Sequence, residues 1–550
     1  MSSCVGITTN SFVESSRNSR RLGVVSPMTL LIVGGVVGLI ARLPGLSSGS
    51  GLFRDDAWVA APSRGSFGQA ANLVSTFPGF SLGLWPWLHL TAPSVLAAQL
   101  PAFVAGLAAL PAVWWMLRRF AVAPWIAAAV SVAISLSPVV ITYSTRVKPY
   151  TAELVIAALL FGLSSARSSR FGWWTLGLAS IVGFTISFAT APTIAACWLA
   201  VLIHERKTPS FVRNVLAPAG TVGALSLMVL GLAWHPVPPS LRAFWQPFFI
   251  DFSSAGSLAR SAQHLLGGLS SGLTGAPLLT TTRPLTTLVA LSVLVVLTVL
   301  FGMAIAAKRL EGVAPVAVLA FAIGLAGVHL VPLGGGRTDE VLYPALGILI
   351  AFGLERLAEV RSGGLHRLVG VFLAVATALV LLAGVSVHRA QYPVSDLDGA
   401  LASSREAPFA QAVVSVMDAP LRYNFAWSGF AATVPTAQVM LQATATNEAG
   451  YTVKLGPNQP KLFVASADHG DSTYHPHAWV AKVARRVSKG ETITFFSITE
   501  QVVNPTTGPL PGQATDPHRS PFWKAFLAAG WKPGPLGVVR GVFFQVLTAP

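Results

Sequence analysis

Charged side chains are scarce in this sequence: Asp, Glu, Lys and Arg together make up 11% of its 550 residues, against 53% hydrophobic residues. Ordinary globular proteins carry about a quarter charged residues. The deficit excludes a soluble multidomain protein and a disordered chain. Cysteine is scarcer still: Cys4 and Cys197 exclude a disulfide framework and a cysteine-based zinc or iron–sulfur site. The composition that remains, with a mean hydropathy of +0.63, is that of a membrane protein.

Apolar runs long enough to cross a bilayer recur along the first two thirds of the chain, since a spanning helix needs roughly 20 residues. They lie at 27–44, 94–117, 122–141, 151–166, 172–189, 191–204, 215–233, 284–307, 313–331, 341–358 and 368–387. We therefore expect a polytopic α-helical membrane protein with about eleven transmembrane helices. The shorter, Trp-rich segment Phe80–Leu90 is expected to be an interfacial helix.

The basic residues predict how the chain crosses the membrane. With a cytoplasmic N-terminus, the inner loops hold fifteen Lys and Arg, and the outer loops before residue 388 hold nine. Cytoplasmic loops carry such an excess, so we expect the N-terminus inside and the C-terminus outside. The net charge of +16 then reflects topology and gives no reason to expect a nucleic-acid partner. Because proline excludes the one N-x-S/T sequence, at Asn504-Pro505-Thr506, a bacterial plasma membrane is the expected location.

Three regions follow from this pattern. Residues 1–26 are expected to be a disordered cytoplasmic tail, 27–387 the membrane domain, and 388–550 a small extracytoplasmic α/β domain, because the last region has no 20-residue apolar run. In that region we expect strands at Lys461–Ala465, Thr492–Ile498 and Gly541–Leu547, and helices near Pro408–Met417, Ala478–Val487 and Pro521–Ala529.

Three polar clusters lie in predicted outer loops. The first follows the first span and contains the adjacent carboxylates Asp55 and Asp56. Ionised carboxylates beside a low-dielectric region are costly unless they meet a cation, a partner or a substrate that needs a base. The alternative is a solvated pair with Arg54 as a local ion-pair partner.

The second cluster, Tyr143–Glu153, includes Arg146 and Lys148 between the third and fourth spans. Cations at headgroup depth suit a phosphate, to which they give charge-assisted hydrogen bonds. The alternative is that the cations only snorkel to the membrane surface and the tyrosines only anchor the helices there. Cations are, however, disfavoured in loops on the outer side of the membrane. The third cluster, Gly334–Pro344, begins with three glycines whose backbone can approach a ligand closely. The alternative interpretation of the third cluster is a flexible turn without a ligand.

At these clusters the chain resembles the GT-C superfamily of membrane glycosyltransferases. The branch it resembles uses polyprenyl-phosphate sugars and includes protein O-mannosyltransferases, aminoarabinose transferases and actinobacterial cell-wall arabinosyl- and mannosyltransferases. The family has an acidic pair after the first span, an Arg and Tyr element opening the fourth, and an Arg followed by Tyr-Pro entering a late span. Here these are Asp55-Asp56, Arg146 through Tyr150, and Arg337 through Tyr343-Pro344.

The resemblance implies a substrate and roles for the cationic and aromatic residues. The donor is a polyprenyl-phosphate-linked sugar, and the acceptor is a hydroxyl of an extracytoplasmic glycan, lipid or protein. Arg146, Lys148 and Arg337 are expected to hold the phosphate and stabilise its charge as the leaving group departs. Tyr150 and Tyr343 are expected to contact the substrate.

The resemblance also implies roles for the acidic residues. Asp55 is the expected general base on the acceptor hydroxyl, in a displacement that inverts the anomeric centre. Asp56 is the second catalytic candidate. It is also a candidate ligand, with Glu153, for Mg²⁺ or Mn²⁺, which carboxylates suit; Asp339 is a weaker candidate.

Two other classes of function remain open. A transporter or flippase of lipid-linked sugars would use the same cations to bind a phosphate. Transporters usually keep polar residues within their spans and show repeated halves, and here we expect almost no polar residues in the spans and find no repeat. The protein can be a non-catalytic membrane scaffold only if Asp55 and Asp56 can be substituted without loss of function.

Overall fold

The structure is a computed structural model. It describes residues 26–47, 56, 59–60, 63–64, 67–73, 76–91, 94–165, 170–233, 245–274, 312–335, 337–359, 412–414, 451–454, 461–464, 476–498, 503–504, 508–509, 521–539 and 542–550. The predicted N-terminal tail, the predicted spans at 284–307 and 368–387, and Asp55 lie outside these residues.

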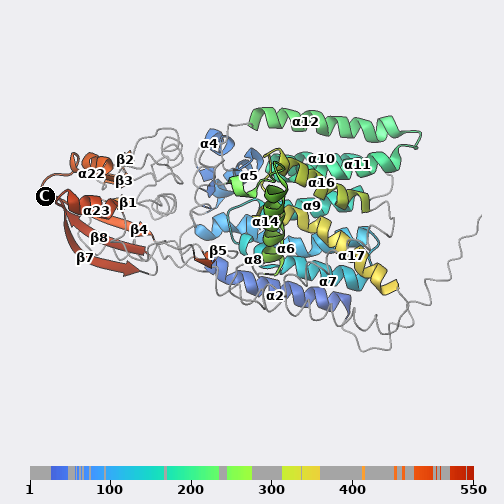
Figure 1. Cartoon of the computed structure of the whole chain (residues 1–550), viewed down its shortest axis with the longest axis horizontal. Coiled ribbons are helices and arrows are strands. Elements are labelled where there is room, and N and C mark those ends of the chain that lie inside the picture. The colour runs from blue at the N-terminus through green and yellow to red at the C-terminus, as the bar shows by residue number, and fades with distance from the viewer. Residues whose placement is uncertain are drawn as a thin grey trace, which may run out of the picture.

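Long apolar helices run side by side along the long axis of the molecule and form a bundle (Figure 1). They are α2 (Pro27–Ser47), α6 (Val95–Arg119), α7 (Pro124–Ser135), α9 (Tyr150–Ser164), α10 (Arg170–Ile186), α11 (Ala191–Glu205), α12 (Ala217–Ala233), α16 (Val313–Gly327) and α17 (Tyr343–Glu359). Among the described residues, four helical stretches are long and apolar enough to cross a membrane, and four more are apolar but shorter. A polytopic helical membrane protein is therefore supported, and the number eleven stays a prediction.

Small residues let these helices approach one another closely. Ala109 and Ala112 of α6 and Ala157 of α9 are among the buried residues of the core, and α6 and α9 are in extensive contact. A Cβ placed on Gly162 of α9 would lie 2.0 Å from the ring of Trp115 on α6. Close approach at small residues is typical of helix packing in membranes, where water does not drive association.

The predicted span 122–141 is wrong as a single helix. The helix α7 ends at Ser135, and α8 (Pro138–Tyr143) begins three residues later. Ser137 is extended, with φ −60° and ψ 141°, because the ring of a following proline disfavours helical backbone in the residue before it. The break brings the chain to the second polar cluster through α8.

The segment predicted as an interfacial helix forms α5 (Pro78–Leu90), preceded by the short helix α4 (Phe67–Ala71). Trp87 Nε1 donates to the carbonyl of Ala97, 2.7 Å away, and so ties α5 to the start of α6. The helix is confirmed, and its position at the membrane interface stays a prediction.

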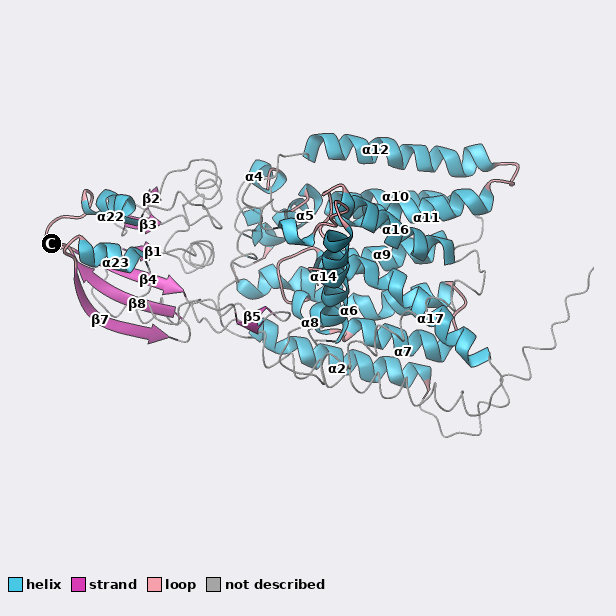
Figure 2. Ribbon diagram, in the orientation of Figure 1, coloured by secondary structure: helices cyan, strands magenta, loops and turns pink. Residues whose placement is uncertain are grey.

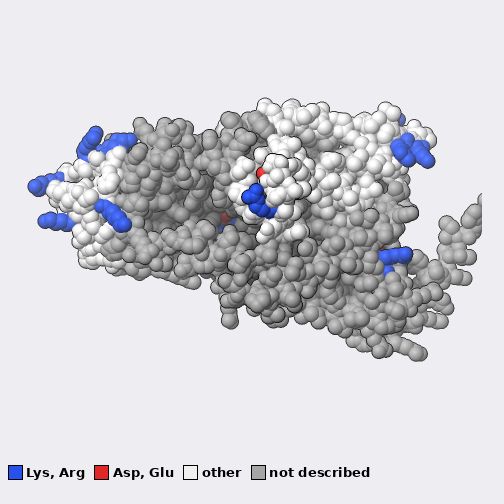
Figure 3. Space-filling view, viewed as in Figure 1, with Lys and Arg blue, Asp and Glu red and all other residues white. Residues whose placement is uncertain are grey.

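Two predicted inner loops lie at the same end of the bundle. Figure 1 places the link between α11 and α12 and the C-terminal end of α17 at the same end of the bundle, away from the sheet and on opposite sides of the bundle. That link contains the exposed Arg206 and Lys207, followed by Arg213 in the π-helical turn η3 (Val212–Leu216), and Figure 3 shows cationic side chains at this end. The sidedness of the membrane stays a prediction.

Helix α14 (Ala255–Thr274) crosses in front of the bundle, at a steep angle to α2 and α12 (Figure 2). It contacts α8, the 3₁₀ turn η4 (Gln246–Phe248) and the 3₁₀ helix η6 (Arg337–Leu342). A Cβ on Gly268 would lie 2.2 Å from the backbone oxygen of Gly334. Helix α14 therefore packs directly on the third polar cluster.

Two neighbouring glycines of α14 provide a matched pair of substitutions. Gly268→Ala forces two backbones apart and is expected to destabilise the protein by about 1–3 kcal/mol, as overpacking does. A Cβ on Gly267 meets nothing within 4 Å, so Gly267→Ala is expected to be neutral or stabilising, by up to about 1 kcal/mol. Thermal denaturation of the purified variants measures both effects, and equal midpoints would contradict the close packing of Gly268 on Gly334.

Residues 412–550 contribute a six-stranded sheet in the order β2-β3-β1-β4-β8-β7. Its strands are β1 (Ala412–Val414), β2 (Tyr451–Lys454), β3 (Lys461–Val464), β4 (Thr492–Ile498), β7 (Lys532–Val539) and β8 (Val542–Thr548); a separate pair is β5 (Val503–Asn504) and β6 (Gly508–Pro509). Helices α22 (Pro476–Ala484) and α23 (Pro521–Ala528) accompany the sheet. The described part of this region thus contains both strands and helices, and a separate extracytoplasmic α/β domain stays a prediction.

The helix predicted near Pro408–Met417 is wrong, because residues 412–414 form strand β1. This strand pairs in parallel with β3 on one side and β4 on the other. Strand preference depends strongly on the neighbours that a strand meets in the sheet, and both of these neighbours are distant in sequence. The expected strands at β3, β4 and β8 and the expected helices at α22 and α23 are present.

Candidate functional site

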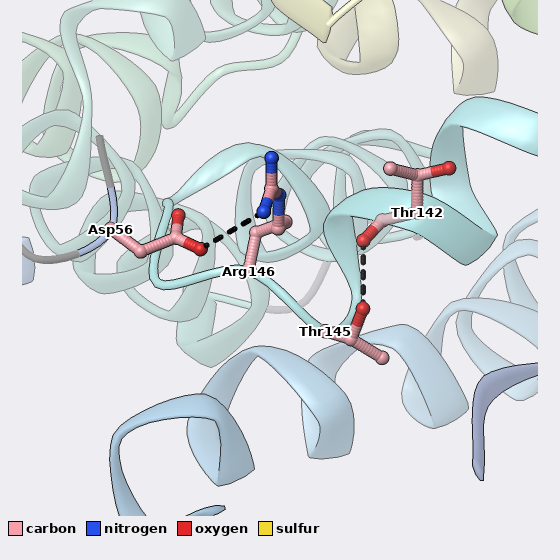
Figure 4. Close-up of polar contacts among 4 residues, drawn as sticks. All are labelled: Asp56, Thr142, Thr145 and Arg146. Carbon is pink, nitrogen blue, oxygen red and sulfur yellow. Dashed lines mark hydrogen bonds and ion pairs between the residues drawn. The ribbon is translucent and has the colours of Figure 1, made fainter. Parts of the chain in front are cut away.

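The first two polar clusters meet in an ion pair. Arg146 Nη1 lies 3.5 Å from Asp56 Oδ2, as Figure 4 shows. The Asp56 side chain is 1% exposed and that of Arg146 is 16% exposed. A carboxylate from the first outer loop and a guanidinium from the second are thus held together away from water.

Arg146 lies on a tight turn between α8 and α9. The Oγ1 of Thr145 donates to the carbonyl of Thr142, 3.0 Å away (Figure 4), and the backbone N–H of Lys148 donates to the carbonyl of Arg146, 2.9 Å away. The carbonyl of Pro149 accepts from the N–H of Glu153 at 2.8 Å and opens α9. Hydrogen bonds fix the turn at both ends, so its cations are carried by a defined backbone.

The other predicted residues of the second cluster belong to the same turn. Lys148 is 8% exposed, and Tyr150 is the first residue of α9. The rings of Tyr143 and Tyr150 pack edge to face with centroids 5.1 Å apart. The predicted phosphate-binding pair and its neighbouring tyrosine therefore share one short segment.

The third cluster forms a turn that leads through η6 into α17. Gly334 has φ +84°, a conformation that favours glycine, and its N–H donates to Asp339 Oδ1, 2.8 Å away. Arg337 is the first residue of η6 and Tyr343 the first of α17. The side chains of Asp339 and Tyr343 are fully buried. Asp339 thus has a structural role, closing the glycine turn.

The second and third clusters also meet, because η6 packs against α9. Glu153 of α9 is 2% exposed and Glu340 of η6 is fully buried. Within the described part of the chain, Glu153 Oε2 and both carboxyl oxygens of Glu340 have no hydrogen-bond partner. Burial, and then the neighbouring Glu153 carboxylate, raise the pKa of Glu340 well above its ordinary value, and the charge of Arg42 opposes the shift.

The raised pKa of Glu340 predicts a pH dependence of stability. An acid whose pKa is raised by folding contributes stability below its unfolded pKa, which is about 4.3, and loses that contribution as the pH rises towards the folded pKa. The midpoint of thermal denaturation is therefore expected to fall in the wild type as the pH rises above the unfolded pKa, and to fall less in Glu340→Gln, which is always neutral. Glu491→Gln, at an exposed position, is the matched control. Parallel curves for the wild type and Glu340→Gln would contradict the assignment.

Sequence reasoning missed Arg42, a fully charged side chain within α2 that is 1% exposed. The expectation of almost no polar residues inside the spans is wrong at this position. The sequence did contain an indication of Arg42, because a charged residue inside a 20-residue apolar run costs free energy to bury and is usually functional. Glu340 lay inside the third cluster and was not singled out either.

The predicted metal ligands are not brought into a recognisable metal centre. Among the described residues, no group of three or more His, Cys, Asp or Glu side chains is arranged to hold a metal ion. Asp56 faces Arg146 instead, and a guanidinium competes with a cation for the same carboxylate. A divalent cation at Asp56 and Glu153 stays a prediction.

The arrangement defines a helical membrane bundle with a polar site built from its loops, and solved structures share this fold. The sequence matches no known family profile and no curated protein. ArnT from Cupriavidus metallidurans in the apo state superposes with a TM-score of 0.53 at 12% identity, covering 94% of this chain and 97% of ArnT. ArnT bound to undecaprenyl phosphate gives a TM-score of 0.51 at the same identity and coverage. This likeness shows that the chain shares the fold of ArnT, and membership of the GT-C superfamily stays a prediction.

Proposed function

We propose that this protein is a glycosyltransferase that moves a sugar from a polyprenyl-phosphate carrier to an extracytoplasmic acceptor hydroxyl. The observation that carries the proposal is the buried contact between Asp56 and Arg146, where the acidic loop meets the cationic turn. The fold supports it, because the similar ArnT is a glycosyltransferase and binds undecaprenyl phosphate.

In the proposed reaction, Asp55 accepts the proton of the acceptor hydroxyl. The acceptor oxygen then forms a bond to the anomeric carbon on the face opposite the phosphate, and the bond between that carbon and the phosphate oxygen breaks. The electron pair leaves with the polyprenyl phosphate, so the anomeric configuration inverts. No oxidant or reductant is required.

The cations of the two turns stabilise the leaving group. Arg146, Lys148 and Arg337 bind the phosphate and offset the charge that grows on it in the transition state. Asp56 orients Arg146 through their ion pair. Tyr150 and Tyr343, which begin α9 and α17, border the substrate.

The proposed setting is the outer face of a bacterial plasma membrane, with the polyprenyl tail in the bilayer between spans. The acceptor belongs to a cell-envelope glycan, glycolipid or protein, and the sugar is a hexose or a pentose. The β-sheet region formed by residues 412–550 is assigned to the same outer side.

Deletion of the protein, followed by glycan analysis of the envelope, tests the proposal. We expect one glycosidic linkage to disappear and to return with the wild-type protein, while Asp55→Asn at equal expression fails to restore it. An unchanged envelope glycan profile in the deletion strain would refute the proposed function.

A further inference from the structure

The first span contains one buried arginine whose contacts lead to the site. Arg42 lies in α2, a helix with mostly apolar side chains, and is 1% exposed. Burying a guanidinium inside an apolar span costs free energy unless its donors are satisfied. The partners that satisfy it therefore indicate what the arginine does.

Each nitrogen of the guanidinium donates a hydrogen bond to a different place in the fold. Nη1 donates to the carbonyl of Gly38, 2.8 Å away, within α2. Nη2 donates to the carbonyl of Ser135 at the end of α7, 2.7 Å away, and Nε donates to Ser144 Oγ, 2.9 Å away. The planar fork of arginine provides these fixed directions, which the single ammonium of lysine does not.

Ser144 is the cap residue of α8 and lies two residues before Arg146. Its hydroxyl accepts from Arg42 and donates to the carbonyl of Ile141, 2.6 Å away. Its side chain thus connects the first span to the turn that carries Arg146 and Lys148. A shift at Ser144 moves the start of that turn.

Gly106 of α6 packs against the contact between Arg42 and Ser144. A Cβ on Gly106 would lie 2.2 Å from Ser144 Cβ and 3.2 Å from Arg42 Nε. Four elements, α2, α6, α7 and the end of α8, therefore meet at one guanidinium without space for another side chain. The charge of Arg42 also favours the ionised form of Glu340 in η6, which relates it to the third cluster.

We propose that Arg42 is a positioning residue for the phosphate site: through Ser144 it fixes the turn from which Arg146 and Lys148 reach the lipid phosphate. This inference rests on the proposed function for the identity of the ligand. Arg42 itself contacts protein groups, so its effect on phosphate binding passes through the turn.

The test compares Arg42→Met, Arg42→Lys, Ser144→Ala and the double variant Arg42→Met/Ser144→Ala in the purified full-length protein. The matched control is Ser131→Ala, because the Ser131 hydroxyl is also buried but donates within its own helix, to the carbonyl of Ala127. Two quantities are measured: hydrogen exchange of the backbone amides in residues 143–150, and the dissociation constant of undecaprenyl phosphate.

We expect Arg42→Met to accelerate exchange in residues 143–150 and to weaken undecaprenyl phosphate binding about tenfold, with Arg42→Lys between it and the wild type. Ser144→Ala is expected to weaken binding by a smaller factor, and the double variant to match Arg42→Met, because both changes break one connection. The control is expected to behave as the wild type.

Unchanged exchange and binding in Arg42→Met, or fully independent effects of Arg42→Met and Ser144→Ala, would overturn the inference. If Arg42→Met does not fold, Arg42→Lys and Ser144→Ala test the inference instead, by hydrogen exchange of residues 143–150 and by the dissociation constant of undecaprenyl phosphate. If the wild type does not bind undecaprenyl phosphate, the proposed function fails, and the exchange measurement still decides whether Arg42 fixes the turn.

Discussion

Asp55→Asn is expected to lower the turnover number for sugar transfer by roughly 10²–10⁴-fold while leaving expression unchanged. General bases contribute about that factor, and the amide of Asn cannot take the proton of the acceptor hydroxyl. Donor affinity is expected to change little, because the phosphate is held by the cations of the second and third clusters. Turnover and donor KM, measured with purified protein and a lipid-linked sugar, separate these effects.

The matched control is Asp251→Asn, an exposed aspartate in the segment before α14 whose Oδ1 accepts from the N–H of Ser253. It is expected to retain full activity. Wild-type turnover by Asp55→Asn would show that Asp55 is not the base, and equal losses of turnover in both variants would indicate a general effect of charge.

Asp56→Asn is expected to raise the donor KM as well as lower turnover, because Asp56 orients Arg146.

Arg146→Met is expected to lower turnover by roughly 10²–10³-fold, the usual effect of removing one group that stabilises charge in the transition state. The variant also removes a positive charge 3.5 Å from the buried Asp56 carboxylate, so its thermal stability is expected to fall. Adding Asp56→Asn to Arg146→Met is expected to restore part of the stability and none of the turnover. Kinetics and thermal denaturation on the same preparations measure both.

Arg260→Met is the control for this change. Arg260 is an exposed cation of α14, and its Nη2 lies 3.2 Å from Ser257 Oγ. Its replacement is expected to leave turnover unchanged. If Arg146→Met keeps wild-type turnover, the cationic turn does not serve the phosphate, and the mechanism proposed here is wrong.

The sequence predicted the main parts of the site because charge near a membrane is costly and therefore easy to notice. Asp56, Arg146 and Lys148 stand out in loops between apolar runs, and the structure brings Asp56 and Arg146 into contact. Periodicity and apolar length likewise located helices such as α6 and α12, since these depend on local composition alone.

The remaining features depend on contacts between distant segments. The role of Arg42 becomes visible only once Ser135 and Ser144, about a hundred residues away, lie beside it. Glu340 shows its unusual environment only when η6 packs on α9 beside Glu153. Strand β1 is specified by the two parallel neighbours that it meets in the sheet. None of these pairings leaves a periodic or compositional signal.

The central claim is that the protein forms a glycosidic bond from a polyprenyl-phosphate sugar, and transfer in detergent tests it most directly. Purified wild-type protein in detergent micelles is incubated with lipid-linked sugars and envelope acceptors extracted from the deletion strain. Micelles contain no bilayer across which a transporter could move its substrate. We predict release of polyprenyl phosphate and an equal amount of new glycoside, absent with Asp55→Asn. No product in micelles, together with movement of lipid-linked sugar across reconstituted vesicles, would contradict the account and identify a transporter.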